Sequence, residues 1–168
     1  MPYAATHILI PILIVALFRD FYLRKRSRDK FPLHYVLFAG LGGVLPDFDI
    51  IISIFLNLIG AADWNVHKTI LHSVFLPIGL FILFLILKPV NYRARICNLT
   101  RHNLKLATIF LMISIGMAIH ILLDYYFWSF VGIFPSELRV LVAPTLDGVL
   151  LVVWIVYLEW RHKISDFI

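Results

Sequence analysis

Five long apolar stretches make up most of this chain, and they constrain its fold more than any other feature. A helix needs about 20 apolar residues to cross the hydrocarbon of a bilayer. The chain is 61% hydrophobic and only 15% charged, with a mean hydropathy of +0.91, which sets it apart from ordinary soluble domains. We therefore expect an all-α, polytopic bundle of about five transmembrane helices in one membrane-embedded domain, residues 1–168. The predicted spans are 1–18, 33–59, 69–87, 106–127 and 140–158.

The first two stretches are the least regular of the five. A signal peptide is the competing interpretation of residues 1–18. However, the basic residues follow the apolar stretch instead of preceding it, and no small-x-small cleavage site is present. We interpret residues 1–18 as a retained first span. Residues 33–59 contain Pro46, which removes a helical hydrogen bond and predicts a kink. Gly40, Gly42 and Gly43 precede it and predict close packing and a local break.

The basic residues predict the orientation. All Lys and Arg residues except Lys68 and Arg139 fall between spans one and two, between spans three and four, or after span five. The positive-inside rule then places the N-terminus outside and the C-terminus inside. Basic loops beside anionic lipid headgroups explain the net charge of +5, so no nucleic-acid partner is expected. The single cysteine, Cys97, lies in a loop expected inside, which excludes a disulfide framework and a thiolate metal site.

Residues of the kinds that ligate metals interrupt the apolar sequence at four places: His7, Pro46-Asp47-Phe48-Asp49, the segment from His67 to His72, and the segment from His120 to Asp124. A charged side chain at the bilayer centre costs roughly 2.5–3.5 kcal/mol on insertion scales, so such residues mark functional sites. The predicted topology places all four, and Asp147 with them, between the midplane and the outer surface. This shared depth is what a common site requires.

Local spacing supports a common site. His120 and Asp124 stand four residues apart, which puts both on one helix face, either as two ligands or as a ligand and its orienting partner. His67 and His72 are five residues apart, about 140° around a helix, and share a face only if His67 precedes the helix. Asp49 could cap the half-helix that follows Pro46.

Each polar group also has a simpler structural interpretation. His7 could be an interfacial residue near a chain terminus, and Asp47 and Asp49 could serve only the cap and the kink. His120 and Asp124 could form a hydrogen-bonded pair that holds helices together. Asp147 could satisfy backbone broken at Pro144. The remaining histidines are expected at span edges or in basic loops: His34, His102 and His162.

The order of these motifs resembles the YdjM/YbcI-type inner-membrane, metal-dependent hydrolases. Members carry an N-terminal His, a PD-x-D motif, an H-[RK]-x-x-x-H-S motif and an H-x-x-x-D motif, and residues 1–135 contain all four in this order. The order is also similar, more distantly, to that of zinc-dependent phospholipase C and single-strand nucleases. Those enzymes carry a late H-x-x-x-E pair that this chain lacks.

The resemblance implies a hydrolase-like domain with a set of metal ligands and a few catalytic groups. The implied metal ligands are His7, Asp47, Asp49, His72, His120 and Asp124. His67 is implied as a ligand or a group that contacts substrate. Ligand sets of imidazole and carboxylate without thiolate suit zinc best here, with manganese or iron as alternatives, and one or two ions.

The hypothesis from sequence is a metal-dependent hydrolase in the cytoplasmic membrane of a prokaryote. Its substrate is a phosphodiester or ester, lipid-like because the site lies within reach of acyl chains, and its catalytic candidates are Asp47, Asp49 and His67. A bound metal activates water and clamps the oxygens of such a group, and whichever of Asp47 and Asp49 is not a ligand is the expected general base. The alternatives are a divalent-metal or proton transporter, and a scaffold without catalysis.

Overall fold

The chain folds almost entirely into helices. The computed structural model describes residues 4–23, 31–60, 71–90, 93–94, 104–131, 133 and 135–161. Its helices are α1 (Ala4–Leu17), a π-helical turn η1 (Phe18–Tyr22), α3 (His34–Val44), a 3-10 turn η2 (Leu45–Asp47), α4 (Phe48–Leu58), α5 (Phe75–Leu87), α6 (Leu106–Val131) and α7 (Ser136–Arg161). The one strand pairing in these residues is short and antiparallel, β1 (Arg93–Ala94) with β2 (Leu104–Lys105).

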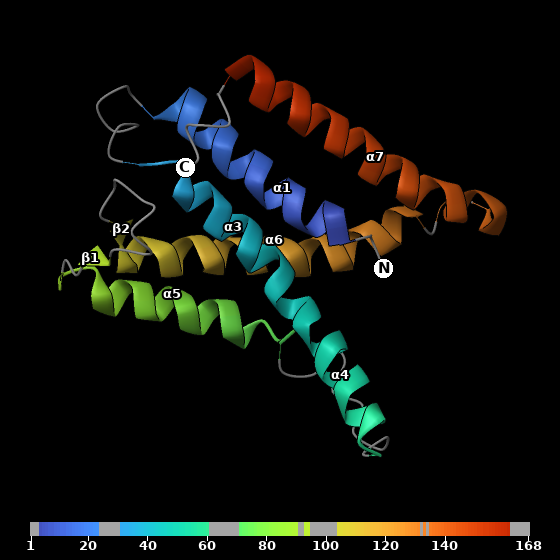
Figure 1. The fold of residues 1–168 in the computed structure, drawn as a ribbon, viewed down its shortest axis with the longest axis horizontal. Helices are drawn as coiled ribbons and strands as arrows, with labels where there is room; N and C mark the ends of the chain where they lie inside the picture. The colour runs from blue at the N-terminus through green and yellow to red at the C-terminus, as the bar shows by residue number, and fades with distance from the viewer. Residues whose placement is uncertain are drawn as a thin grey trace.

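Three helices form the centre of the bundle. α3 packs against both α1 and α6, most extensively against α6, while α5 lies along α6 and α7 lies along α1. α4 continues from α3 but leaves the bundle and projects away from it (Figure 1). The buried apolar side chains come mainly from α1, α3 and α6, among them Ile12, Val15, Val36, Ala39, Ile109 and Met112.

Glycines let the central helices approach backbone to backbone. A Cβ atom added to Gly116 on α6 would lie 2.0 Å from the carbonyl oxygen of Ala39 on α3. A Cβ atom at Gly43 would lie 2.0 Å from the carbonyl oxygen of His7 on α1. No side chain fits in these gaps, so the close packing expected of the glycines before Pro46 is confirmed for Gly43.

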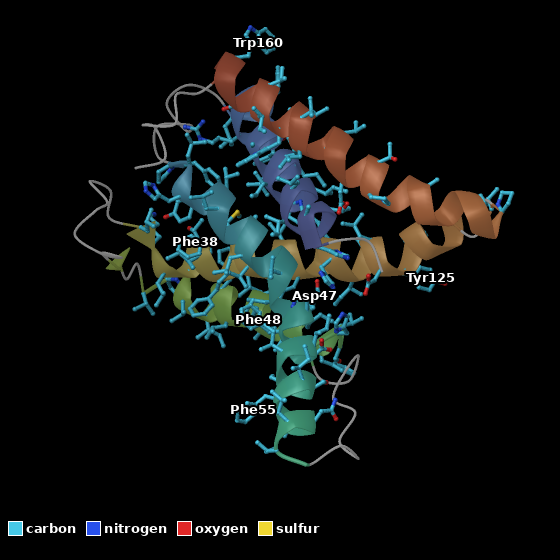
Figure 2. The ribbon with its side chains drawn as sticks, turned by 45° about the vertical axis from the view of Figure 1, so that its right-hand side comes forward. Phe38, Asp47, Phe48, Phe55, Tyr125 and Trp160 are labelled. Atoms are coloured by element: carbon cyan, nitrogen blue, oxygen red, sulfur yellow. The ribbon has the colours of Figure 1, made fainter. Side chains whose placement is uncertain are left out.

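The helices are of the kind that crosses a membrane. In the described part of the chain, three are long and apolar enough to do so: Ala5–Tyr22, His34–Leu58 and Leu106–Tyr126. Two further apolar helical stretches are shorter, Phe75–Leu87 and Asp147–Tyr157. Large apolar side chains on the outer faces are exposed, such as Phe55, which points away from the bundle in Figure 2. The prediction of an all-α membrane protein is confirmed; the count of five spans and their orientation stay predictions.

Two predicted spans differ in detail from the helices. The break expected at Pro46 is present as η2, with helix on both sides. The third span was expected from residue 69, but α5 begins only at Phe75, with Pro77 in its first turn, a position that proline tolerates. His72 therefore lies in a turn before the helix. α7 runs through Pro144 as one continuous helix, and Asp147 contacts Thr6 of α1.

Two polar contacts hold α7 against α1, one near each end of the pair. Thr6 donates a hydrogen bond to Oδ1 of Asp147. Further along, the Tyr157 hydroxyl donates to Asp20, which also pairs with Arg19 at 2.8 Å between Nη1 and Oδ1. Hydrogen bonds between polar groups are a common means of joining helices in membranes.

Basic residues gather at the end of the bundle that contains Asp20. Arg19 Nε donates to the Phe31 carbonyl at 2.8 Å, and the Lys105 amide donates to the Tyr35 hydroxyl at 2.7 Å, which ties η1, α3 and β2 together there. The start of α1 and the end of α6 lie at the opposite end (Figure 1). This arrangement fits the orientation that the positive-inside rule predicts.

The packing at Gly116 predicts a matched pair of stability effects. Gly116→Ala should lower the thermal midpoint of the detergent-purified protein by several degrees, because overpacking a tight contact typically costs about 1–3 kcal/mol. Gly79→Ala should keep or raise it, since a Cβ there meets nothing within 4 Å and alanine favours helix. Equal midpoints for Gly116→Ala and the wild type would contradict a close contact between α3 and α6.

The orientation predicts one-sided labelling of Cys97, which lies outside the described residues. A membrane-impermeant maleimide should label it only after spheroplasts are lysed, because its loop is expected inside. The control is Ile133→Cys in a Cys97→Ser background, which should label in intact spheroplasts since residue 133 lies in the turn between α6 and α7 at the opposite end. Labelling of Cys97 in intact spheroplasts would show that the orientation is the reverse of the predicted one.

Candidate metal centre

Four separate elements bring five His and Asp side chains to one place. They are His7 from α1, Asp47 from η2, His72 from the turn before α5, and His120 and Asp124 from α6. Figure 2 shows Asp47 where the chain passes from α3 to α4, beside α6. Residues more than 110 positions apart in sequence thus share one cluster, which we call the His–Asp cluster.

His120 is fully buried, and its environment fixes which ring nitrogen carries the proton. Nδ1 lies 2.7 Å from the carbonyl oxygen of Gly43. A carbonyl oxygen only accepts, so Nδ1 donates and, in the neutral imidazole, Nε2 presents its lone pair. The lone pair therefore faces the His–Asp cluster.

His72 has the same arrangement with a different partner. Its Nδ1 lies 2.9 Å from Oδ2 of Asp49, a carboxylate that is fully buried. Nδ1 donates to this carboxylate, which leaves Nε2 of the neutral ring as an acceptor on the opposite side. A carboxylate behind a histidine in this way fixes the tautomer and ring orientation of metal-ligating imidazoles in many proteins.

The two Nε2 atoms and two carboxylate oxygens converge. His72 Nε2 and His120 Nε2 are 3.3 Å apart. Asp124 Oδ2 lies 3.5 Å from the first and 3.8 Å from the second. Asp47 Oδ1 lies 3.8 Å and 3.7 Å from the same two nitrogens. His120 and Asp124 are too far apart for a mutual hydrogen bond, so the simple helix-joining pair is not what forms here.

These separations fit a small metal ion. Ligand atoms about 2.1 Å from a tetrahedral zinc lie about 3.4 Å from one another. Both triangles, the two nitrogens with Asp47 Oδ1 or with Asp124 Oδ2, have sides of 3.3–3.8 Å. The donors are imidazole and carboxylate, which zinc, manganese and iron accept. The chemistry and spacing of the residues therefore fit a divalent metal.

His7 provides a second face of the cluster. Its Nε2 lies 3.4 Å from Asp124 Oδ1, and its ring lies 3.9 Å from that of His120, centroid to centroid. His7, His120 and Asp124 form a group with ligand atoms within 4.8 Å of one another. Among the residues that the structure describes, the buried atoms His7 Nδ1 and Asp124 Oδ1 have no hydrogen-bond partner. Asp124 thus directs one oxygen to each side.

The sequence-predicted site residues are mostly brought together. Five of them, His7, Asp47, His72, His120 and Asp124, point into the His–Asp cluster. Asp49 is adjacent but contacts the far nitrogen of His72, and it lies in the first turn of α4 instead of capping it. His67 lies outside the described residues, as does Lys68.

Two groups near the cluster were not expected from sequence. The Gly43 carbonyl holds His120, and Thr6, beside His7, holds Asp147. The glycines before Pro46 were a signal of close packing, but no side-chain motif marks a backbone carbonyl as a histidine acceptor.

Nearly the whole chain matches a family of membrane proteins. The model of the family described as "YdjM inner membrane protein" matches residues 1–164. No curated protein and no solved structure matches the chain. With helices able to cross a membrane and a family match over nearly its full length, the chain belongs to the YdjM inner membrane protein family.

Proposed function

We propose that the His–Asp cluster binds one or two divalent metal ions, most readily zinc, and hydrolyses an ester or phosphodiester of a membrane lipid. One observation carries the proposal: the Nε2 atoms of His72 and His120 lie 3.3 Å apart, and one oxygen of Asp47 and one of Asp124 each lie 3.5–3.8 Å from both nitrogens. Such a concentration of electron-rich atoms in low dielectric is costly unless a positive charge joins it.

The described contacts suggest a division of roles. His72, His120 and Asp124 are the ligands of the first metal, because three protein ligands with an open position are the pattern of catalytic zinc. Asp49 and the Gly43 carbonyl are positioning groups, which hold His72 and His120 by their Nδ1 atoms. His7 with Asp124 Oδ1 is the position for a second ion.

Asp47 is the candidate general base. Its side chain is 21% exposed, more than the 14% of Asp124, while Asp49 is buried and already engaged with His72. It lies beside the two ligating nitrogens without a closer partner at Oδ1 in the described part of the chain. A base must stand within hydrogen-bond reach of the water that it deprotonates.

Each of these groups then has its own part in the hydrolysis. A metal held here would supply Lewis acidity and a water of lowered pKa. The oxygen of the attacking water bonds to the phosphorus or acyl carbon, and Asp47 accepts a proton from that water. The bond from that centre to the leaving alcohol breaks, and the proton passes from Asp47 to the leaving oxygen. Water and ester are consumed, and an acid and an alcohol are released.

The position of the cluster favours an enzyme over a transporter. A transit pathway needs ligands at successive depths, as intramembrane His and Asp provide in pumps and transporters. Among the described residues, groups of three or more potential ligands occur only at this cluster. At the other end, Asp20 is engaged by Arg19 and Tyr157.

The first test is metal content and activity of the detergent-purified protein. Wild type should carry about one or two zinc per chain by elemental mass spectrometry, and His120→Ala and Asp124→Asn should lose it, because each removes a ligand. Asp47→Asn should keep the first zinc but lose phospholipid hydrolysis by about 10²–10⁴-fold, the usual contribution of a general base.

The matched control is His34→Ala, which removes a histidine from the opposite end of α3 and should keep both metal and activity. In the competing arrangement no metal binds, and one imidazole of the His–Asp cluster carries a second proton. A wild-type protein that takes up no zinc, manganese or iron on reconstitution would support that arrangement and remove the hydrolase proposal.

The contact between Asp49 and His72 predicts a graded effect on metal binding. Asp49→Asn should weaken zinc affinity about 10–100-fold without abolishing it, since loss of the partner behind a ligating histidine typically has that effect. Zinc competition with a chromogenic chelator measures it. Asp147→Asn, a carboxylate that contacts Thr6 instead, is the control and should bind as wild type does. A loss of zinc binding as complete as in Asp124→Asn would show that Asp49 is itself a ligand.

A further inference from the structure

An apolar groove runs between α5 and α6. Its volume is about 380 Å³, within the range of pockets that hold small ligands. On the α5 side it is lined by Val74, Pro77, Ile78 and Phe81, which recur at the spacing of one helix face. Pro77 is buried and forms part of the floor, while the three apolar side chains beside it are exposed and form a rim.

The α6 side completes the groove with two small and two large residues. Ser114, Ala118, Ile121 and Leu122 line it, again from one face. Ser114 and Ala118 leave the floor hollow because their side chains are short. The Ser114 hydroxyl donates to the Pro77 carbonyl at 2.8 Å, so it is engaged within the protein. The groove is therefore suited to an apolar occupant.

One end of the groove meets the His–Asp cluster. Val74 comes two residues after His72, and Ile121 follows His120 directly. The two helices are antiparallel here, so the groove extends away from the cluster toward Phe81 and Ser114. Eight residues of helix measure about 12 Å. A molecule with a hydrolysable group at the cluster could thus extend an apolar tail along both helices.

We infer that this groove holds an acyl chain of a membrane lipid and thereby places the lipid's ester or phosphodiester at the His–Asp cluster. The inference rests on the proposed function for its second half. The groove opens through exposed apolar residues of α5, a short apolar helix, and of α6, which is long and apolar enough to cross a membrane. In a bilayer, acyl chains would be the solvent around this opening. A soluble phosphodiester has no tail to fill the groove, so the site selects lipids by their chains.

The test is photo-crosslinking, which does not depend on hydrolysis. The full-length protein is placed in phosphatidylcholine nanodiscs that contain phosphatidylglycerol with a diazirine midway along one acyl chain, and labelled residues are mapped by mass spectrometry. Wild type should concentrate label on the groove residues of α5 and α6. Ala118→Phe, which fills the floor, should reduce that label about tenfold, and Ala118→Leu should reduce it by less, because the occupant loses its contacts in proportion to the filled space.

The control is Gly79→Phe, which adds the same ring to α5 outside the groove lining, at a position where a Cβ meets nothing within 4 Å. Its labelling should match wild type, and all three variants should keep wild-type zinc content and thermal midpoint. Label spread evenly over α4, α5, α6 and α7, or unchanged in both Ala118 variants, would overturn the inference and leave the groove to another helix or to no specific occupant.

A second measurement separates the groove from the chemistry. Zinc-loaded protein is given two phosphatidylglycerols with the same headgroup, one with long chains and one with four-carbon chains. Ala118→Phe should lose the preference for the long-chain lipid while it keeps the short-chain rate. If wild type hydrolyses neither lipid but the labelling pattern stands, the proposed function fails and the groove remains a lipid site. If wild type and Ala118→Phe hydrolyse the long-chain lipid at the same rate, and likewise the short-chain lipid, the acyl-chain role of the groove is contradicted while the proposed hydrolysis stands.

Discussion

The close approach of α1, α3 and α6 is the contact on which the rest of the structure depends. At Gly43 and Gly116 the helices meet backbone to backbone, with no room for a methyl group. In a bilayer, where apolar side chains gain little by leaving lipid, such van der Waals contact is a main source of helix association. The same contact brings His7 and His120 together and lets the Gly43 carbonyl accept from His120. The same contact thus holds the three helices together and positions the histidines of the His–Asp cluster.

The Nδ1 partners of the histidines determine what the cluster can bind. Because Gly43 and Asp49 occupy Nδ1 of His120 and His72, neither neutral ring can donate a proton toward the centre. Two lone pairs and two carboxylate oxygens therefore face one another where water cannot solvate them freely. A neutral occupant would leave their repulsion uncompensated, whereas the positive charge of a bound divalent cation, as proposed above, would offset it.

Sequence reasoning predicted the helices, the break at Pro46 and the residues that gather, because periodicity and depth are properties of the chain alone. It could not separate Asp47 from Asp49, since that depends on how η2 turns one carboxylate toward His72 Nε2 and the other toward Nδ1. It also placed the start of the third helix several residues early. Residues 69–74 contain no Lys, Arg, Asp or Glu, so the uncharged stretch continues through them, and only the fold shows that the helix begins after His72.

That late start of α5 shapes how the cluster meets its surroundings. A helix that began before His72 would carry this side chain on a fixed face and cover the cluster with a further turn. In the turn that precedes Phe75, His72 instead reaches the cluster from non-helical backbone. The apolar groove starts beside this turn, at Val74, and follows α6 from Leu122 back to Ser114. If the groove holds an acyl chain, as inferred above, a lipid would enter it by lateral diffusion in the plane of the membrane. Its chain would then lie along α5 and α6, with its ester group at the His–Asp cluster.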